Sequence, residues 1–163
     1  MPSSMVSKIL LDKYLFEAVF FGAMGCAAAM AFSGFGAAYG TAKASVGISS
    51  LAVIDQSKLM QSIIPVVMAG ILGIYGIIVC ITISGKFKTS ADYELAVGYK
   101  HFGAGLIIGL SCLASGLAIG VAGDATVRAY AQTGSMFVIM IMIMIFAECI
   151  ALYGLIIAII ITS

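Results

Sequence analysis

The sequence predicts an all-α membrane protein whose four transmembrane helices form two tandem-duplicated helical hairpins. Of its 163 residues, 63% are hydrophobic and 9% are charged, whereas a soluble domain carries roughly 25% charged residues. The mean hydropathy is +1.20. Four apolar segments are each long enough to cross a hydrocarbon core of about 30 Å. An internal repeat relates the first two of these segments to the last two.

The four predicted spans are joined by three polar stretches. The spans cover residues 18–42, 63–83, 102–122 and 136–161, and the polar stretches cover residues 43–62, 84–101 and 123–135. Lys8 and Lys13 before the first apolar run are also typical of a signal peptide. Because the first span takes part in the repeat, we interpret it as half of a hairpin. We therefore expect one membrane domain over residues 1–163, with hairpins at 18–83 and 102–161.

The repeat is visible in two alignments. A shift of 80 residues pairs small residues of the first span with small residues of the third, namely Gly25, Ala29, Gly36, Ala38 and Gly40 with Gly105, Gly109, Gly116, Ala118 and Gly120. A shift of 78 residues pairs MAGILGIYGII (68–78) with FAECIALYGLI (146–156). Tyr75 then matches Tyr153, and Gly70 matches Glu148. One carboxylate therefore serves a unit of four helices.

Small residues dominate the first and third spans. Pairs of glycines at four-residue spacing, such as Gly36 with Gly40 and Gly116 with Gly120, let helix backbones approach closely in lipid. Simple packing within one chain explains one such face. Because small residues occupy more than one face of the first span, we expect it to line the crowded inner wall of an oligomer of subunits packed side by side. The second and fourth spans, rich in Ile, Met, Leu and Val, would face lipid or a partner.

Glu148 is the only charged residue between Met136 and Ile161. An ionised acid at the centre of a spanning helix costs about 2.5–3.5 kcal/mol, so apolar surroundings favour its neutral, protonated form. No Lys or Arg lies within the four predicted spans, so a cation for the ionised form must come from another polypeptide. We predict that Glu148 is a reversible proton-binding group. The alternative is a structural hydrogen bond that holds two helices together.

The surroundings of Glu148 favour H⁺ over Na⁺. A Na⁺ site needs several fixed oxygens, and the matching level of the second span offers only the hydroxyl of Tyr75, a possible hydrogen-bond partner of the site. Ser111 and Ser115 of the third span are the next candidates. We expect no cofactor, no metal site and no catalytic residue in this chain. The four cysteines (Cys26, Cys80, Cys112 and Cys149) lie in apolar stretches and are interpreted as buried thiols.

Four motifs carry a resemblance to a known family. FGAAYGTAK (35–43), SIIPVVMAG (62–70), LAIGVAGDA (117–125) and IFAECIALYGLI (145–156) are similar to segments of the proteolipid (c) subunit of the eukaryotic vacuolar-type H⁺-ATPase. The resemblance implies a homo-oligomeric or mixed proteolipid ring in the membrane sector of this proton-translocating ATPase. It implies that the ring turns past a stator subunit that supplies an arginine, while a rotor stalk subunit links it to ATP hydrolysis elsewhere. It also assigns Glu148 as the essential carboxylate.

The resemblance also has implications for which ion is carried and for the membrane in which the protein lies. Related sodium-transporting rings place a ligand tyrosine at the position of Tyr75, but their Thr and Gln ligands correspond here to Ile71 and Leu72, which favours protons. The family implies vacuolar, lysosomal or endosomal membranes, with both termini in the lumen. A count of Lys and Arg in the polar stretches would by itself place the termini in the cytoplasm.

Two other function classes stay open on the sequence. One is a small stand-alone ion-coupled transporter with one essential carboxylate, and the other is a channel or adhesion proteolipid without ion coupling. A transporter needs a polar substrate pocket, for which the four spans supply few polar groups. The net charge of +1 excludes a strongly basic surface for nucleic acid.

Overall fold

The computed structural model describes the backbone of residues 2–87 and 93–163, and the side chains of residues 13–87 and 93–163. Its helices are α1 (Pro2–Ile54), η1 (Gln56–Lys58), α2 (Leu59–Ser62), α3 (Ile64–Phe87), α4 (Leu95–Gln132) and α5 (Met136–Thr162). Four of these described helices, α1, α3, α4 and α5, are long and apolar enough to cross a membrane. With no strand in the described backbone, the predicted all-α membrane fold is confirmed.

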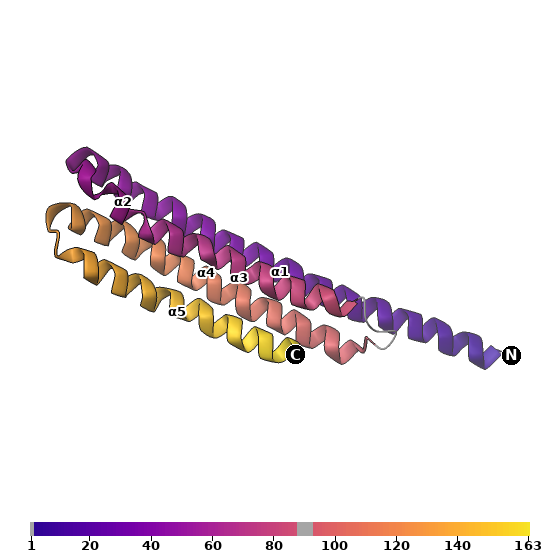
Figure 1. Cartoon of the computed structure of the whole chain (residues 1–163). Coiled ribbons are helices and arrows are strands. Elements are labelled where there is room, and N and C mark those ends of the chain that lie inside the picture. Colours follow the sequence, from indigo (N-terminus) through magenta and orange to yellow (C-terminus); the bar gives the residue numbers. More distant parts are fainter. Residues whose placement is uncertain (1, 88–92) are drawn as a thin grey trace.

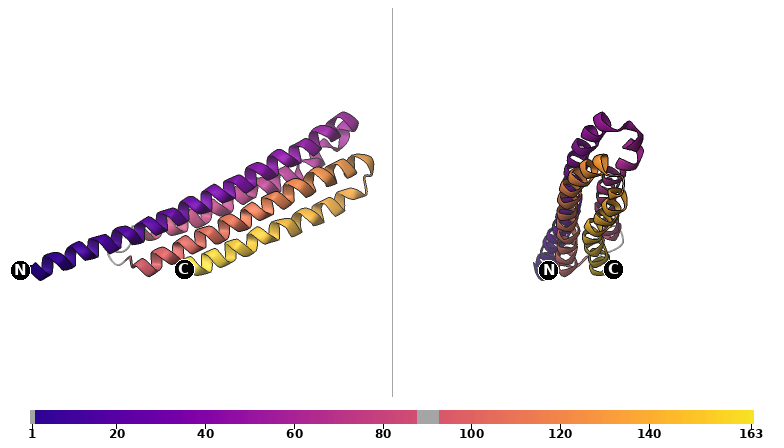
Figure 2. Two further views of the ribbon diagram at one scale, coloured as in Figure 1. Left: turned by 180° about the vertical axis from the view of Figure 1, so that it is seen from behind. Right: turned by 90° about the vertical axis from the view of Figure 1, so that its left-hand side faces the viewer.

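The four long helices lie alongside one another and alternate in direction (Figure 1). The two termini and the connection from α3 to α4 lie toward one end of the bundle, and η1, α2 and the turn from α4 to α5 lie at the other. Seen along the bundle, α1 and α4 form one layer while α3 and α5 form the second (Figure 2). The first helices of the two predicted hairpins thus lie side by side, and so do the second helices.

The helices extend well beyond the predicted apolar spans. α1 continues to Ile54, and α4 covers residues 95–132, so most of the polar stretches 43–62 and 123–135 is helical. The polar stretches between the apolar spans are therefore not loops along their whole length. Hydropathy marks where contact with lipid ends, but Ala, Ser and Lys residues continue a helix into water. α1 ends where Asp55 caps the next turn by accepting a hydrogen bond of 3.0 Å from the Ser57 amide.

Glycines bring α1 and α4 into backbone contact. A Cβ atom on Gly36 would lie 2.4 Å from the carbonyl oxygen of Cys112, and one on Gly116 would lie 2.1 Å from that of Gly36. One on Gly105 would meet the Gly25 backbone in the same way. The predicted close approach at these glycines is therefore found inside one chain, between the two hairpins. A different row of small residues on α1 remains exposed: Ala23, Ala27, Ala31, Ala38 and Ala42.

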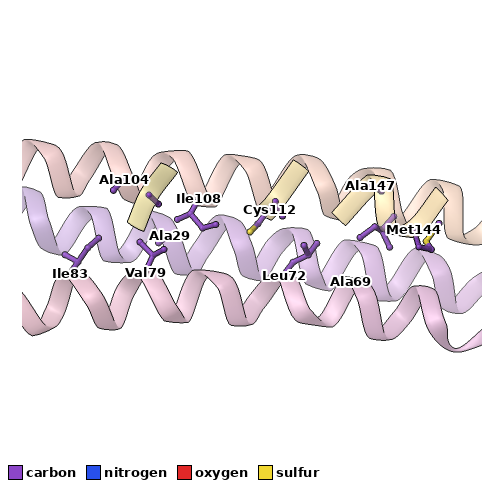
Figure 3. Packing of buried hydrophobic residues seen from close by; sticks show 13 residues of the cluster. Ala29, Ala69, Leu72, Val79, Ile83, Ala104, Ile108, Cys112, Met144 and Ala147 are labelled. Atoms are coloured by element: carbon purple, nitrogen blue, oxygen red, sulfur yellow. The ribbon is translucent and has the colours of Figure 1, made fainter. Parts of the chain in front are cut away.

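A buried apolar cluster fills the space between the two layers (Figure 3). Its large members are fully buried, among them Leu72 and Val79 of α3 and Ile108 of α4. Ala147, the residue before Glu148, belongs to the same cluster. The core therefore fixes α5 against α3 and α4 at the level of the predicted site.

Candidate functional site

Glu148 lies near the middle of α5, within the bundle. Twelve helical residues precede it and fourteen follow it in α5 (Met136–Thr162), which corresponds to about 18 Å and 21 Å of helix on its two sides. Glu148 is only 9% exposed within the single chain. Both lengths are comparable to half of a hydrocarbon core of about 30 Å, so the carboxyl group lies deep in the apolar part of the molecule.

Tyr75 is the hydrogen-bond partner of this carboxyl group. The Tyr75 hydroxyl, on α3, donates to Glu148 Oε1 over 2.7 Å. Tyr75 is itself half-buried, and its ring packs against the apolar cluster between the layers. The structure thus brings together the two residues that the sequence singled out. Whether either residue binds an ion stays a prediction.

Ser115 lies at the same level and bonds to the backbone next to Glu148. Its hydroxyl, fully buried, donates to the carbonyl oxygen of Ala147 over 2.8 Å. This bond joins α4 to α5 one residue before the acid. The sequence marked Ser115 as a candidate oxygen but could not give its depth, because the depth depends on the register between two helices.

Ser111 is displaced along the bundle from Glu148. Its hydroxyl donates to Ile107 in its own helix over 2.7 Å, and it packs against Gly154 of α5. Gly154 is six residues from Glu148, or about 9 Å along the helix axis. Of the two predicted serines, only Ser115 is at the level of the acid.

Glu148 forms no ion pair within residues 13–87 and 93–163. The ion pairs there join Lys43 and Arg128 to Asp124, and Lys58 to Asp55. Asp55 and Lys58 belong to the connection between α1 and α3, and Asp124 lies near the same end of the bundle. The ion pairs among the described residues therefore lie near one end, and the Glu148 carboxyl has a neutral hydroxyl as its partner.

His101 lies away from this site, in a polar cluster near the start of α4. It is buried, and Nδ1 of its ring pairs with the hydroxyl of Tyr93, whose ring contacts Phe87 edge-on at a centroid distance of 5.4 Å. Burial raises the pKa of Tyr93 to about 12, so its hydroxyl keeps its proton at physiological pH. The cluster has a structural role, since it ties the end of α3 to the start of α4.

A bundle of apolar helices that holds one carboxyl group at membrane depth is typical of ion-handling membrane proteins. Comparison with known proteins narrows the class: the chain belongs to the ATP synthase C-subunit family. The family model matches it twice, at residues 24–83 and 102–161, and each match lies within one predicted hairpin. The resemblance found in the sequence motifs is confirmed.

Individual relatives carry the names of V-type proton ATPase subunits. The 16 kDa proteolipid (c) subunit of Nephrops norvegicus is 56% identical over 140 residues, which are 86% of this chain and 88% of the relative. The proteolipid subunit of Dictyostelium discoideum is 48% identical over 158 residues, covering 97% and 81%. The c′ subunit of Saccharomyces cerevisiae is 44% identical over 163 residues, covering 100% and 98%.

Proposed function

We propose that this chain is a rotor-ring subunit in the membrane sector of a V-type proton-translocating ATPase, and that Glu148 carries one proton at a time. Family membership and the names of the relatives support the first part. The observation that carries the second part is the isolation of Glu148, which is buried in the bundle and bonded to the Tyr75 hydroxyl.

The protonated form of Glu148 suits the part of each ring rotation in which the subunit faces lipid. A neutral carboxyl group avoids the cost of about 2.5–3.5 kcal/mol for an ionised acid at the centre of a spanning helix. In this form Oε1 accepts the hydrogen bond from Tyr75, and the proton resides on Oε2. The apolar residues of α5 around the acid exclude water, so the proton stays bound while the subunit moves.

The ionised form needs a cation that the described part of the chain does not supply next to Glu148. A stator subunit with an arginine would supply it, since a guanidinium and a carboxylate form a strong charge-assisted pair. Proton release then occurs where the ring meets the stator, and reloading occurs from the other aqueous side. A rotor stalk subunit would transmit the rotation driven by ATP hydrolysis.

The carried ion is H⁺ in this proposal. Leu72, at a position where related sodium-transporting rings have a polar ligand, is fully buried in the apolar core. The oxygens of Glu148 and Tyr75 are too few for a Na⁺ shell. The proposal includes no cofactor.

We further place the protein in vacuolar, lysosomal or endosomal membranes, with both termini in the lumen. Four spanning helices require the termini to share one side of the membrane, and both termini lie toward one end of the bundle (Figure 1). The connections at the opposite end would face the cytoplasm and the stalk.

Labelling with a hydrophobic carbodiimide tests the site in the assembled complex. Such a reagent reaches acids in the apolar core and reacts with their protonated form. We expect peptide mapping to find the label on Glu148, and not on the exposed Glu94 at the start of α4. ATP-driven acidification should fall in proportion to the label. Labelling of Glu148 without any loss of acidification would contradict proton carriage.

The same preparation separates the rotor from the alternative, a stand-alone ion-coupled transporter. The detergent-solubilised membrane complex should contain a closed ring of many proteolipid copies. A monomer or dimer of this chain would favour the transporter.

A further inference from the structure

Gly76, the residue after Tyr75, lies where α3 comes closest to α1. Gly76 is buried, and a Cβ atom on it would lie 2.8 Å from the carbonyl oxygen of Ala29 and 2.8 Å from Cβ of Ser33. It would also overlap the Ser33 hydroxyl oxygen. A rotation of the serine side chain would move the hydroxyl, but the other two atoms are fixed by the backbone of α1. The two helices therefore keep this distance only if residue 76 has no side chain.

The Ser33 side chain fills the space beside Gly76. It is fully buried, and its hydroxyl donates to the carbonyl oxygen of Met30 over 3.3 Å within α1. Because its own helix satisfies the hydroxyl, the serine presents a small surface of fixed shape to α3. The contact of Ser33 with Gly76 thus sets the distance between the two helices.

The same contact recurs in the second hairpin. The 78-residue shift pairs Ser33 with Ser111 and Gly76 with Gly154, and a Cβ atom on Gly154 would overlap Oγ and Cβ of Ser111. The tyrosine before this second glycine, Tyr153, is 63% exposed. The second contact therefore packs the helices of one hairpin, whereas the first also lies next to the tyrosine that bonds to the acid.

The place of Gly76 on α3 fixes the direction in which Tyr75 points. Successive residues of a helix point about 100° apart, so a glycine that faces α1 turns the preceding residue toward another neighbour. Tyr75 faces α5 in this way, and its hydroxyl donates to Glu148 Oε1 over 2.7 Å. Hydrogen bonds between oxygens are made at about 2.5–3.0 Å, so a displacement of α3 on the order of 1 Å would carry the hydroxyl out of reach.

We propose that Gly76 is a positioning residue of the proton site, because its contact with Ser33 holds α3 at the distance from α1 at which Tyr75 reaches Glu148. It acts through Tyr75. The acid has a separate support, since Ser115 of α4 bonds to the backbone of α5 beside it. A side chain at residue 76 would therefore move the tyrosine and leave the acid in place. The inference rests on the proposed function of Glu148 and deepens it.

The pH dependence of carbodiimide labelling tests the position of Tyr75 in the assembled complex. Dicyclohexylcarbodiimide reacts with the protonated form of Glu148, so the pH of half-maximal labelling reports on the hydrogen bond that the acid accepts. We expect Gly76→Ala to shift this pH in the same direction as Tyr75→Phe. ATP-driven acidification should slow by about two- to tenfold, as for the loss of one hydrogen bond.

Gly73→Ala is the matched control, since Gly73 lies about one turn before Gly76 on the same helix. A Cβ atom on Gly73 would lie 3.8 Å from Cβ of Ala37, which is an ordinary van der Waals distance. Alanine favours the helix over glycine at both positions, so the two variants differ in the clash with α1. Labelling and acidification by Gly73→Ala should both be normal.

Double variants show whether Gly76 acts through the tyrosine. In Tyr75→Phe protein the hydroxyl is already absent, so the addition of Gly76→Ala should change the labelling profile little further. Ser33→Gly removes two of the three close contacts and should restore part of the normal profile to Gly76→Ala. An unchanged labelling profile of Gly76→Ala in intact rings would overturn the proposal, and so would a full additional shift on top of that of Tyr75→Phe.

Ser33→Cys is a milder form of the same change, for use if Gly76→Ala prevents assembly. Its sulfur is larger than the hydroxyl oxygen and presses on Gly76 from α1, so the labelling profile should shift in the same direction by a smaller amount. Loss of assembly in both variants would overturn the proposal, because the contact would then hold the fold together and not adjust the tyrosine.

The two readouts separate this proposal from proton carriage. A shifted labelling profile of Gly76→Ala with normal acidification would support the positioning of Tyr75 and contradict proton carriage by Glu148. A shift in Tyr75→Phe but none in Gly76→Ala would contradict the positioning role and leave proton carriage intact.

Discussion

The carboxyl group of Glu148 accepts a hydrogen bond from a tyrosine that lies 73 residues away along the chain. Neither residue could form this bond within its own helix, so the site exists only when the two predicted hairpins pack together. The bond is neutral when the acid is protonated, and it persists in stronger form when the acid is ionised, since hydrogen bonds to charged groups are worth more. Tyr75 therefore stabilises both forms and supports the one that is harder to bury.

Tyr75→Phe removes the hydroxyl and keeps the ring in the apolar cluster. The loss of one hydrogen bond of about 0.5–1.5 kcal/mol should slow ATP-driven acidification by about two- to tenfold without preventing assembly. Acidification is measured by quenching of a pH-sensitive dye in sealed vesicles. Tyr99→Phe, at an exposed tyrosine of α4, is the matched control and should acidify normally. Equal rates for the two variants would show that the Tyr75 hydroxyl has no part in proton carriage.

At the level of the helices, α5 is positioned by α4 as well as by α3. The Ser115 hydroxyl bonds to the Ala147 carbonyl, and Gly154 lets Ser111 approach α5 further along. The glycines between α1 and α4 set the distance within the other layer. The acid is thus held by rigid elements, which suits the proposed contact of Glu148 with a stator subunit at a fixed height.

Ser115→Ala should loosen the contact between α4 and α5. The change removes a buried hydrogen bond worth about 1 kcal/mol, so the midpoint of thermal unfolding of the purified complex should fall. Ser115→Thr, which keeps the hydroxyl, should restore part of the loss. Ser111→Ala is the matched control, because that hydroxyl bonds only within its own helix in the described structure. A larger loss for Ser111→Ala than for Ser115→Ala would contradict this account of α5.

On the scale of the whole molecule, composition and periodicity predicted the four spanning helices, and an isolated charge predicted the central residue of the site. Both signals can be read from a short stretch of sequence, because a hydrocarbon environment disfavours charged residues in every spanning segment. Tyr75 could be predicted as well, since the repeat aligns the second and fourth spans and so gives the depth of each residue.

Other features depend on contacts that no local signal encodes. The ends of α1 and α4 lie well past the apolar runs, because helix formation continues in water where hydropathy falls. The glycine pattern predicted that the first span lies close to another helix but did not identify that helix. From the sequence alone, a contact of Gly36 with α4 of the same chain could not be distinguished from a contact with another subunit. The level of Ser115 depends on the short turn at residues 133–135, which sets the register of α5.

The charge distribution also belongs to this scale. The ion pairs of the described residues lie toward the end of the bundle opposite the termini, and the centre of the bundle holds Glu148. A molecule built in this way is suited to turn within lipid, because its described residues form no ion pair at membrane depth. In the proposed function, transport depends on the single acid for the same reason.

The most direct test of proton carriage is ATP-driven acidification by a complex that contains Glu148→Gln. Glutamine keeps the shape and a hydrogen-bond acceptor for Tyr75 but cannot take up or release a proton. We expect the complex to assemble with its full ring and ATP-driven acidification to be abolished. Glu94→Gln, which changes an exposed acid outside the spans, should acidify at the normal rate. Normal acidification by an assembled Glu148→Gln complex would show that Glu148 does not carry the proton.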